Sequence, residues 1–333
     1  MTRTGRVAVV GAGAFGTALA LVALKAGREV TLWTRDPAHA DAIRKAGENA
    51  AYLPGARIPP DLTVTADPAE IRTAGLVLLA VPAQATRAAA RALAPDVPPR
   101  IPVIACAKGI ETGTGLRQSE IIRQVLPEAT PAAISGPGFA EEIARGLPTA
   151  VTIAADELAI ARTLASALAT DVFRPYASDD LCGVELGGAI KNVLAIAAGI
   201  VAGRSLGESA RAALIARGLA EMMRLGAALG ARAETFMGLS GLGDLVLTAT
   251  SPRSRNLAFG MALGAGRRAA DLVRPGMPLA EGVATARVAA DLARSHGVDA
   301  PIVAAVAAIV EGAITVETAI EGLVSRPLKA ENA

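Results

Sequence analysis

Apolar residues in the first half of the chain fall in short runs separated by longer stretches rich in Ala and Leu. Short runs of Val, Ile and Leu bounded by Gly or Pro are typical of buried strands, and the longer stretches are typical of helices. We predict strands at residues 6–10, 29–33, 74–81, 101–107, 132–135, 149–154 and 172–176. We predict helices at residues 17–26, 84–93, 114–125 and 157–169, and another from residue 141. This alternation predicts a doubly wound α/β domain with a mostly parallel sheet.

The second half of the chain carries no strand signal after about residue 184. Its apolar positions fit helices at residues 184–202, 209–230, 256–264, 279–296, 301–312 and 315–322. A chain of 333 residues is long enough for two hydrophobic cores, so we predict a boundary near residues 180–184. The α/β domain then covers residues 1–183 and an all-α domain covers residues 184–325, followed by a short polar tail at 326–333.

A glycine-rich turn follows the first predicted strand. It reads Gly11-Ala12-Gly13-Ala14-Phe15-Gly16 and leads directly into a helix, and a second strand follows at residue 29. In this setting the first glycine permits a tight turn, the second lets a pyrophosphate approach the backbone, and the third lets helix and strand pack closely. The turn therefore predicts a Rossmann-like dinucleotide site at a helix N-terminus. The alternative is a glycine-rich turn that binds nothing.

The end of the second predicted strand bears on which dinucleotide binds. An NAD-specific site usually has Asp or Glu there, but this position holds Thr34, followed by Arg35. An arginine can bind the 2′-phosphate of NADP(H) or stack on adenine. This favours NADP(H), or use of both NADP(H) and NAD(H). Asp36 keeps strict use of NAD(H) open, although its alternative role is to cap the helix that starts at Pro37.

Lys191 lies in an almost wholly apolar predicted helix, in the stretch Gly187-Gly-Ala-Ile-Lys-Asn192. A buried ammonium is costly unless it is paired, and burial lowers its pKa toward neutrality, so such a lysine suits proton transfer. The alternative is a lysine whose stem packs while its head reaches water. Lys108 follows another predicted strand, where ligands of such sheets bind, and is a candidate anion contact.

Two further polar stretches lie in the second half of the chain. Asp244 ends a glycine-rich turn that begins at Gly238, and we expect a carboxylate in that position to interact with a partner. Ser254, Arg255 and Asn256 then open a predicted helix. Ser254 can cap this helix, and Arg255 can hold a phosphate at the end where helix N–H groups favour an anion. The alternative is a capped helix start with solvated arginines.

Composition narrows the classes of protein. The chain is 52% hydrophobic, 19% charged and 2% aromatic, with a formal net charge of +2, which gives no case for binding nucleic acid. Cys106 and Cys182 read as reduced core residues, as expected in the cytoplasm. The mean hydropathy of +0.42 draws attention to the uncharged residues 7–24, but three glycines interrupt them. We therefore expect no membrane span and no targeting segment.

Taken together, these motifs resemble the NAD(P)-dependent glycerol-3-phosphate dehydrogenases of the bacterial soluble kind. The likeness runs from about residue 6 to 325. The matching stretches are Gly11-Ala-Gly-Ala-Phe-Gly-Thr-Ala-Leu-Ala20, Cys106-Ala-Lys-Gly109, Ile134-Ser-Gly-Pro-Gly-Phe-Ala140, Gly187-Gly-Ala-Ile-Lys-Asn192, Arg217-Gly-Leu-Ala-Glu221, Gly241-Leu-Gly-Asp-Leu245 and Ser254-Arg-Asn256. The glycine turn alone is shared with many enzymes, whereas the later motifs in this order are much more specific.

The resemblance implies a role for each matched residue. Lys191 would be the catalytic proton donor and acceptor, and Asp244 would position the substrate and its lysine partner. The implied cofactor-binding residues are Gly11, Gly13, Ala14, Phe15, Gly16, Arg35, Lys108, Ala140, Arg255, Leu279 and Glu281. The implied substrate-binding residues are Lys108, Gly136, Gly138, Lys191, Asp244, Ser254, Arg255 and Asn256. The family usually has Ser or Thr where this chain has Gly138, so only a main-chain contact is expected there.

The activity implied by the resemblance is reversible reduction of glycerone phosphate to sn-glycerol 3-phosphate by NAD(P)H, for glycerophospholipid synthesis. The partner is then a small phosphorylated molecule; no metal is expected, and a homodimer is compatible with this picture. One rival is a lysine-dependent reductase of the 3-hydroxy-acid or ketopantoate type, which would have less use for Arg255. The other is a dinucleotide-sensing module without turnover, which would have no need of Lys191 as a proton donor.

Overall fold

The computed structural model describes residues 5–273 and 280–327, and its Cα packing divides the chain into two compact units. Unit 1 consists of residues 1–188 and 230–244, and unit 2 consists of residues 189–229 and 245–333. The border between the units lies within helix α7 (Leu181–Gly203), which continues across the predicted boundary at residue 184. Residues 230–244 belong to unit 1 although they follow the first helices of unit 2 along the chain.

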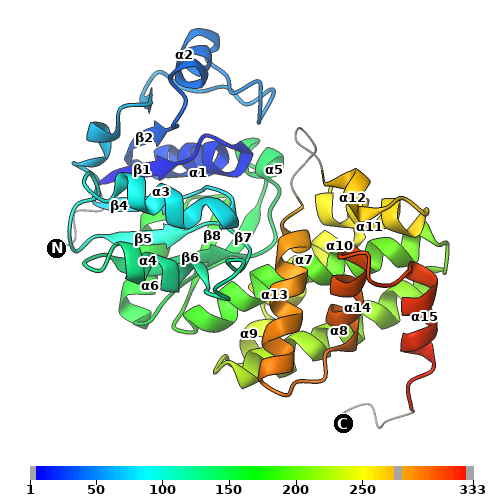
Figure 1. The fold of residues 1–333 in the computed structure, drawn as a ribbon. Helices are drawn as coiled ribbons and strands as arrows, with labels where there is room; N and C mark the ends of the chain where they lie inside the picture. Colours follow the sequence, from blue (N-terminus) through cyan, green and yellow to red (C-terminus); the bar gives the residue numbers. More distant parts are fainter. Residues whose placement is uncertain (1–4, 274–279, 328–333) are drawn as a thin grey trace. The chain divides into compact units, whose positions relative to one another are not determined.

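Unit 1 is built on an eight-stranded sheet with the order β3-β2-β1-β4-β5-β6-β7-β8 (Figure 1). The strands are β1 (Arg6–Val10), β2 (Glu29–Trp33), β3 (Leu62–Thr65), β4 (Leu76–Leu79), β5 (Pro102–Ala105), β6 (Thr130–Ser135), β7 (Thr149–Ala155) and β8 (Phe173–Ser178). All neighbours pair in parallel except β6 and β7. The structure therefore confirms the mostly parallel α/β sheet.

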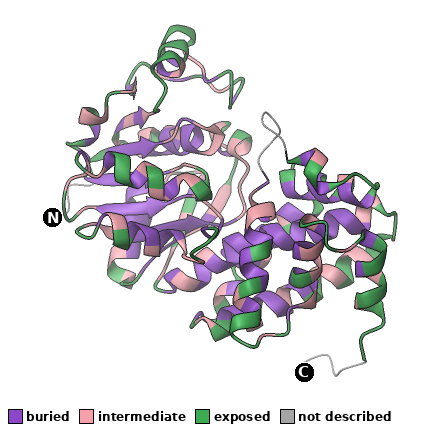
Figure 2. Cartoon of the chain, in the orientation of Figure 1, coloured by how far each residue is buried: buried purple, intermediate pink, exposed green. Residues whose placement is uncertain are grey.

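Helices cover both faces of this sheet. The helices of unit 1 are α1 (Ala14–Lys25), α2 (Pro37–Ala46), α3 (Thr86–Leu93), α4 (Gln118–Val125), α5 (Ala140–Ala144), α6 (Leu158–Leu168) and α9 (Ala233–Met237), with short helical turns η1 (Pro68–Ile71), η2 (Ala83–Ala85) and η3 (Leu239–Gly243). Successive residues of a strand point to opposite faces. Val7 and Val9 accordingly join one core with α1 and α6, while Ala8 and Val10 join a second core with α3 and α4. Strands buried on both faces explain the continuous apolar runs in the sequence (Figure 2).

The antiparallel step between β6 and β7 has a physical cause in the connection. Helix α5 has five residues and spans about 7 Å, whereas the six residues of β6 span about 20 Å. So short a helix does not return the chain to the opposite end of the sheet, and β7 therefore runs back beside β6.

Helices are the only regular secondary structure among the described residues of unit 2. They are the C-terminal part of α7, α8 (Glu208–Ala228), α10 from Leu245 (Asp244–Thr250 in full), α11 (Arg255–Gly264), α12 (Ala269–Leu272), α13 (Glu281–Ser295), α14 (Pro301–Val310) and α15 (Val316–Val324). This agrees with the all-α prediction. Among the described residues, α7 alone is a helix long and apolar enough to cross a membrane, and 89% of its apolar window is buried inside the protein.

Candidate functional site

The glycine turn joins β1 to α1 at the carboxyl end of the sheet strands. Gly11 has φ 111°, and a Cβ there would lie 2.5 Å from the Ala80 carbonyl oxygen. A Cβ at Gly16 would lie 2.0 Å from the Gly11 carbonyl oxygen, so these two glycines permit close backbone packing. A Cβ at Gly13 would meet nothing within 4 Å, although Gly13 caps α1 with ordinary extended dihedrals. Open space at a helix N-terminus fits a pyrophosphate, which helix N–H groups attract.

The end of β2 presents an arginine to solvent. Thr34 is buried and Arg35 is exposed, directly before α2. The Asp36 carboxylate accepts a 3.0 Å hydrogen bond from the Ala38 N–H, so Asp36 has the alternative role of a helix cap. This bond engages one oxygen of Asp36 in the cap. The side chain at this strand end that suits a 2′-phosphate is therefore Arg35.

Lys108 is the centre of a polar cluster in unit 1. It lies three residues beyond the end of β5, and its Nζ is 2.7 Å from Asp244 Oδ2 and 2.7 Å from the Gly136 carbonyl oxygen. The ammonium also lies 5.9 Å from the centre of the Phe15 ring, within reach of a cation–π interaction. Asp244 is 2% exposed, so its charge is held in the protein by this ion pair. The structure thus brings four of the predicted site residues together.

The turn after β6 contributes compact backbone to this cluster. Gly136 has φ 136°, and a Cβ there would lie 2.9 Å from Val151 Cα. A Cβ at Gly138 would lie 3.1 Å from Ile143 Cδ1, so a Ser or Thr there would require this side chain to shift. Ala140 begins the short helix α5 directly after the turn. The missing hydroxyl at residue 138 is therefore accompanied by tight local packing.

Lys191 lies in α7 within unit 2 and is 5% exposed. Its Nζ donates a 2.6 Å hydrogen bond to Thr248 Oγ1. Burial of the ammonium agrees with the interpretation of Lys191 as more than a solvated lysine. Sequence reasoning missed Thr248. The signal that could have found it is its position one helical turn after Asp244 in α10.

A second set of polar contacts in unit 2 orders the start of α11. Ser254 Oγ accepts from the Leu257 N–H at 3.1 Å, which confirms the predicted cap, and Arg255 is the exposed first residue of the helix. Asn256 Nδ2 donates to Asn192 Oδ1 at 2.8 Å, and its own Oδ1 accepts from the Gly282 N–H at 3.1 Å. A hydrogen bond therefore connects α7, which carries Lys191 and Asn192, with α11, which begins at Arg255.

The two remaining predicted cofactor residues are adjacent in sequence to this network. Glu281 begins α13 and is partly exposed. Leu279 lies outside the described residues. Among the residues that the structure describes, no group of three or more His, Cys, Asp and Glu could hold a metal ion.

Cys106 and Cys182 both lie in unit 1. Burial raises the pKa of the Cys106 thiol far above its usual range, despite the nearby Lys108 charge. Burial also raises the pKa of Cys182 to about 11. Both thiols are therefore protonated near neutral pH. Cys106 is buried, as predicted for a core residue, whereas Cys182 is only partly buried.

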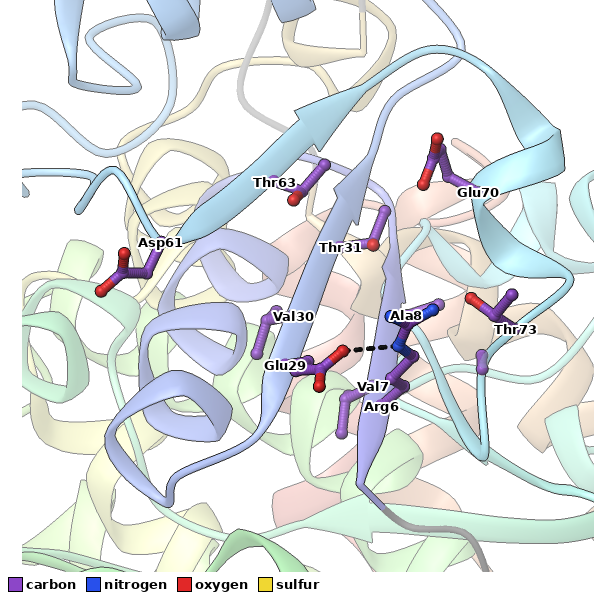
Figure 3. Close-up of a pocket in the computed structure, with 11 residues that line it drawn as sticks. Arg6, Val7, Ala8, Glu29, Val30, Thr31, Asp61, Thr63, Glu70 and Thr73 are labelled. Carbon is purple, nitrogen blue, oxygen red and sulfur yellow. Dashed lines mark hydrogen bonds and ion pairs between the residues drawn. The ribbon is translucent and has the colours of Figure 1, made fainter.

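A cavity has a volume of about 210 Å³, and Figure 3 shows the residues that line it. Its lining includes Arg6 and Glu29, which form a 2.5 Å ion pair at the amino ends of β1 and β2. Ligands of such sheets bind at the opposite, carboxyl ends of the strands. Charges of mixed sign line the cavity, and none of the predicted site residues does.

The matching family models and the most similar curated relatives agree on one family. The model of the NAD-dependent glycerol-3-phosphate dehydrogenase N-terminus matches residues 6–161, and that of the C-terminus matches residues 180–321. The chain is 54% identical over 331 residues to glycerol-3-phosphate dehydrogenase [NAD(P)+] of Rhodopseudomonas palustris strain BisB5, covering 99% of this chain and 100% of that one. It is 55% identical over 331 residues to the protein of the same name from Bradyrhizobium sp. strain BTAi1, with the same coverage.

A solved structure supports the same assignment. The crystal structure of glycerol-3-phosphate dehydrogenase from Coxiella burnetii matches with a TM-score of 0.91 and 37% identity, covering 97% of this chain and 99% of that one. The match extends over the Rossmann-like sheet and the helical part alike. The chain belongs to the NAD-dependent glycerol-3-phosphate dehydrogenase family.

Proposed function

We propose that this protein catalyses the reversible reduction of glycerone phosphate to sn-glycerol 3-phosphate with NAD(P)H. The observation that carries the proposal is the buried Lys191, 5% exposed, in a chain that is 54% identical over its full length to a relative named for this activity. A 3-hydroxy-acid or ketopantoate reductase is not favoured, because the family match covers both halves of the chain.

The chemistry needs a hydride and a proton at adjacent atoms of the substrate. When bound, the dinucleotide supplies the hydride to the carbonyl carbon. Lys191 then gives its proton to the carbonyl oxygen as that oxygen gains charge, and it accepts the proton in the reverse reaction. Thr248, which accepts a hydrogen bond from Lys191 Nζ, supports the direction of the ammonium. Positioned proton transfer of this kind contributes about 10²–10⁴-fold to the rate.

The remaining polar residues are proposed to bind the substrate and the cofactor and to orient them. Arg255 is proposed to hold the substrate phosphate, since it is an exposed arginine at a helix N-terminus, with Ser254 and Asn256 beside it. Lys108, held by Asp244, is proposed to contact both cofactor and substrate, with main-chain contacts at Gly136 and Gly138. A phosphate held away from the reacting carbon uses binding energy to orient it.

The dinucleotide is proposed to bind along the glycine turn, through Gly11, Gly13, Ala14, Phe15 and Gly16. Its adenosine end would meet Arg35, and its nicotinamide end would meet Ala140. Arg255, Leu279 and Glu281 are the further proposed contacts. We favour NADP(H) over NAD(H) because Arg35 is exposed while Asp36 caps α2. Replacing Arg35 by Ser is expected to raise the KM for NADPH and to leave that for NADH nearly unchanged.

The experiment that tests the catalytic assignment is Lys191→Ala. We expect turnover to fall by about 10²–10⁴-fold while NADPH still binds, since the glycine turn is untouched. Lys25→Ala is the matched control, because Lys25 forms an exposed ion pair with Asp171. Near-normal turnover in Lys191→Ala would refute its role. Faster oxidation of NADPH with 2-oxo or 3-oxo acids than with glycerone phosphate would refute the proposed substrate.

In the cell, we propose that the enzyme works in the cytoplasm and supplies glycerophospholipid synthesis, with a homodimer as one arrangement open to it. Depletion of the protein is then expected to slow phospholipid labelling unless sn-glycerol 3-phosphate is supplied. Sedimentation of the purified protein measures its oligomeric state directly.

A further inference from the structure

Asn49 lies in the segment between α2 and β3 and is 1% exposed. Its Nδ2 donates two hydrogen bonds, both of 2.8 Å. One goes to the Ala12 carbonyl oxygen in the glycine turn, and the other goes to Thr17 Oγ1 in the first turns of α1. A single amide therefore links the turn to the helix that follows it.

The orientation of this amide follows from its partners. The Ala12 carbonyl oxygen only accepts hydrogen bonds, so the NH₂ group of Asn49 must face it. Asn49 Oδ1 is then buried without a hydrogen-bond partner among the described residues. A buried acceptor without a partner is unfavourable, and an apolar side chain of similar shape would avoid that cost. The feature that explains an asparagine here is its pair of donors.

The bond to Ala12 also sets the direction of the next N–H group. The peptide between Ala12 and Gly13 is trans, as no described peptide is cis, so its C=O and N–H point in opposite directions. The carbonyl points into the protein toward Asn49, and the Gly13 N–H therefore points away from it. This N–H donates to no described residue, and the space beside Gly13 Cα is open for 4 Å around a built Cβ.

We infer that Asn49 is a positioning residue for the dinucleotide: it holds the Ala12–Gly13 peptide so that the Gly13 N–H faces the pyrophosphate. The inference rests on the proposed placement of the pyrophosphate at the glycine turn. His39 Nε2 lies 3.4 Å from the same carbonyl oxygen and gives a weaker second contact. Because NADPH and NADH share the pyrophosphate, Asn49 acts equally on both, unlike Arg35.

Asn49→Leu tests this role, because leucine keeps the approximate shape and removes both donors. The Kd values for NADPH and NADH, measured by titration of the protein with each dinucleotide, are both expected to rise by roughly tenfold. The kcat at saturating NADPH is expected to stay near the wild-type value. A merely structural role would instead lower the melting temperature and leave both Kd values unchanged, and that outcome would overturn the inference.

Two further variants keep the result interpretable. Glu48→Gln is the control from the same segment, since its side chain accepts from the Gly55 N–H on the surface, and its Kd values should match wild type. If Asn49→Leu does not fold, Thr17→Val removes the other partner of the amide. Both Kd values are then expected to rise by about threefold, and unchanged values would again overturn the inference.

Another variant distinguishes a failure of the proposed function from a failure of this inference. Gly13→Ala places a methyl group where the pyrophosphate is proposed to lie, and does not touch Asn49. If Gly13→Ala weakens binding and Asn49→Leu does not, the role of Asn49 is wrong and the site stands. If neither variant weakens the binding that the wild-type protein shows, the glycine turn is not the pyrophosphate site.

Discussion

Glycines serve opposite purposes in the two units. In the turn of unit 1, a Cβ at Gly13 would meet nothing within 4 Å. In unit 2, where α7 crosses α11, a Cβ at Gly199 would lie 2.2 Å from the Leu257 carbonyl oxygen, and one at Gly260 would lie 2.0 Å from that of Ile196. The first glycine borders open space, where the pyrophosphate is proposed to bind, and the other two leave space for a helix.

The crossing in unit 2 continues one turn further along both helices. Gly203 and Gly264 follow at a spacing of four residues, and a Cβ at either would lie within 2.5 Å of a carbonyl oxygen of the opposite helix. Residues four apart share a helix face, so the two backbones approach along a stripe. This contact fixes α7, which carries Lys191, against α11, which begins at Arg255. Glycine thus sets the geometry of a proposed catalytic residue without touching a ligand.

Gly260→Ala is expected to have the largest effect on stability among these glycine variants. The added methyl group would force the backbones of α7 and α11 apart, and overpacking of this kind costs about 3 kcal/mol. We expect the melting temperature to fall by several degrees and the KM for glycerone phosphate to rise. The Kd for NADPH is expected to rise less than this KM, because the glycine turn belongs to unit 1 and only Arg255, Leu279 and Glu281 of the proposed cofactor contacts belong to unit 2. Unchanged stability would contradict the close crossing.

Gly13→Ala is expected to show the reverse pattern. The dihedrals of Gly13 suit any residue and the methyl group meets no protein atom, so the melting temperature should change little. The Kd for NADPH should rise by about 10–100-fold, which corresponds to roughly 1.4–2.7 kcal/mol. Tight binding of NADPH by this variant would mean that the open space beside Gly13 holds no pyrophosphate.

The comparison also shows what local sequence patterns can predict. The glycine turn, the cap at Ser254 and the buried lysine were all predicted, because each depends on neighbours within a few residues. The functions of Gly13 and Gly260 depend on what faces them, which no local pattern contains. The partners of Lys108 are also distant along the chain, since Gly136 lies 28 residues away and Asp244 lies 136 residues away.

Other parts of the fold escaped prediction for similar reasons. A helix starting at Pro37 was expected only as an alternative, and neither β3 nor the contact of Asn49 with the glycine turn was predicted. Asn49 and Thr248 are polar residues whose partners only the fold brings near. Sequence patterns therefore led to the proposed site, and tertiary contacts added Asn49 and Thr248, which are proposed to orient it.

A smaller effect on stability is expected from a change of pH, and it acts through a residue of unit 2. In unit 2, Glu221 accepts hydrogen bonds from the Ile302 and Val303 N–H groups at the start of α14. Burial raises the pKa of Glu221 to about 7, although these bonds oppose the shift. The folded state then favours the protonated form, so stability is greatest below the usual pKa and falls as pH rises toward 7.

Glu221→Gln removes this titration and keeps an acceptor for the backbone. The difference in unfolding free energy between the two proteins should change by about 1–2 kcal/mol between pH 4.5 and 7, with the wild type losing stability as pH rises. Paired thermal melts across this range measure it. The Kd for NADPH should respond alike in both proteins, since Glu221 is not among the proposed cofactor contacts. Parallel melting curves at every pH would contradict the shifted pKa.

The smallest expected effect comes from a glycine with neither purpose. Gly322 lies on the exposed side of α15, and a Cβ there would meet nothing within 4 Å, as at Gly13. Alanine in an exposed helix is better than glycine by about 0.5–1 kcal/mol, so Gly322→Ala should raise the melting temperature slightly. Its Kd for NADPH should equal that of the wild type. If Gly322→Ala weakened NADPH binding as much as Gly13→Ala, the loss of binding in Gly13→Ala would not identify a ligand site. If it does not, the helix N-terminus beside Gly13 is what distinguishes the two positions.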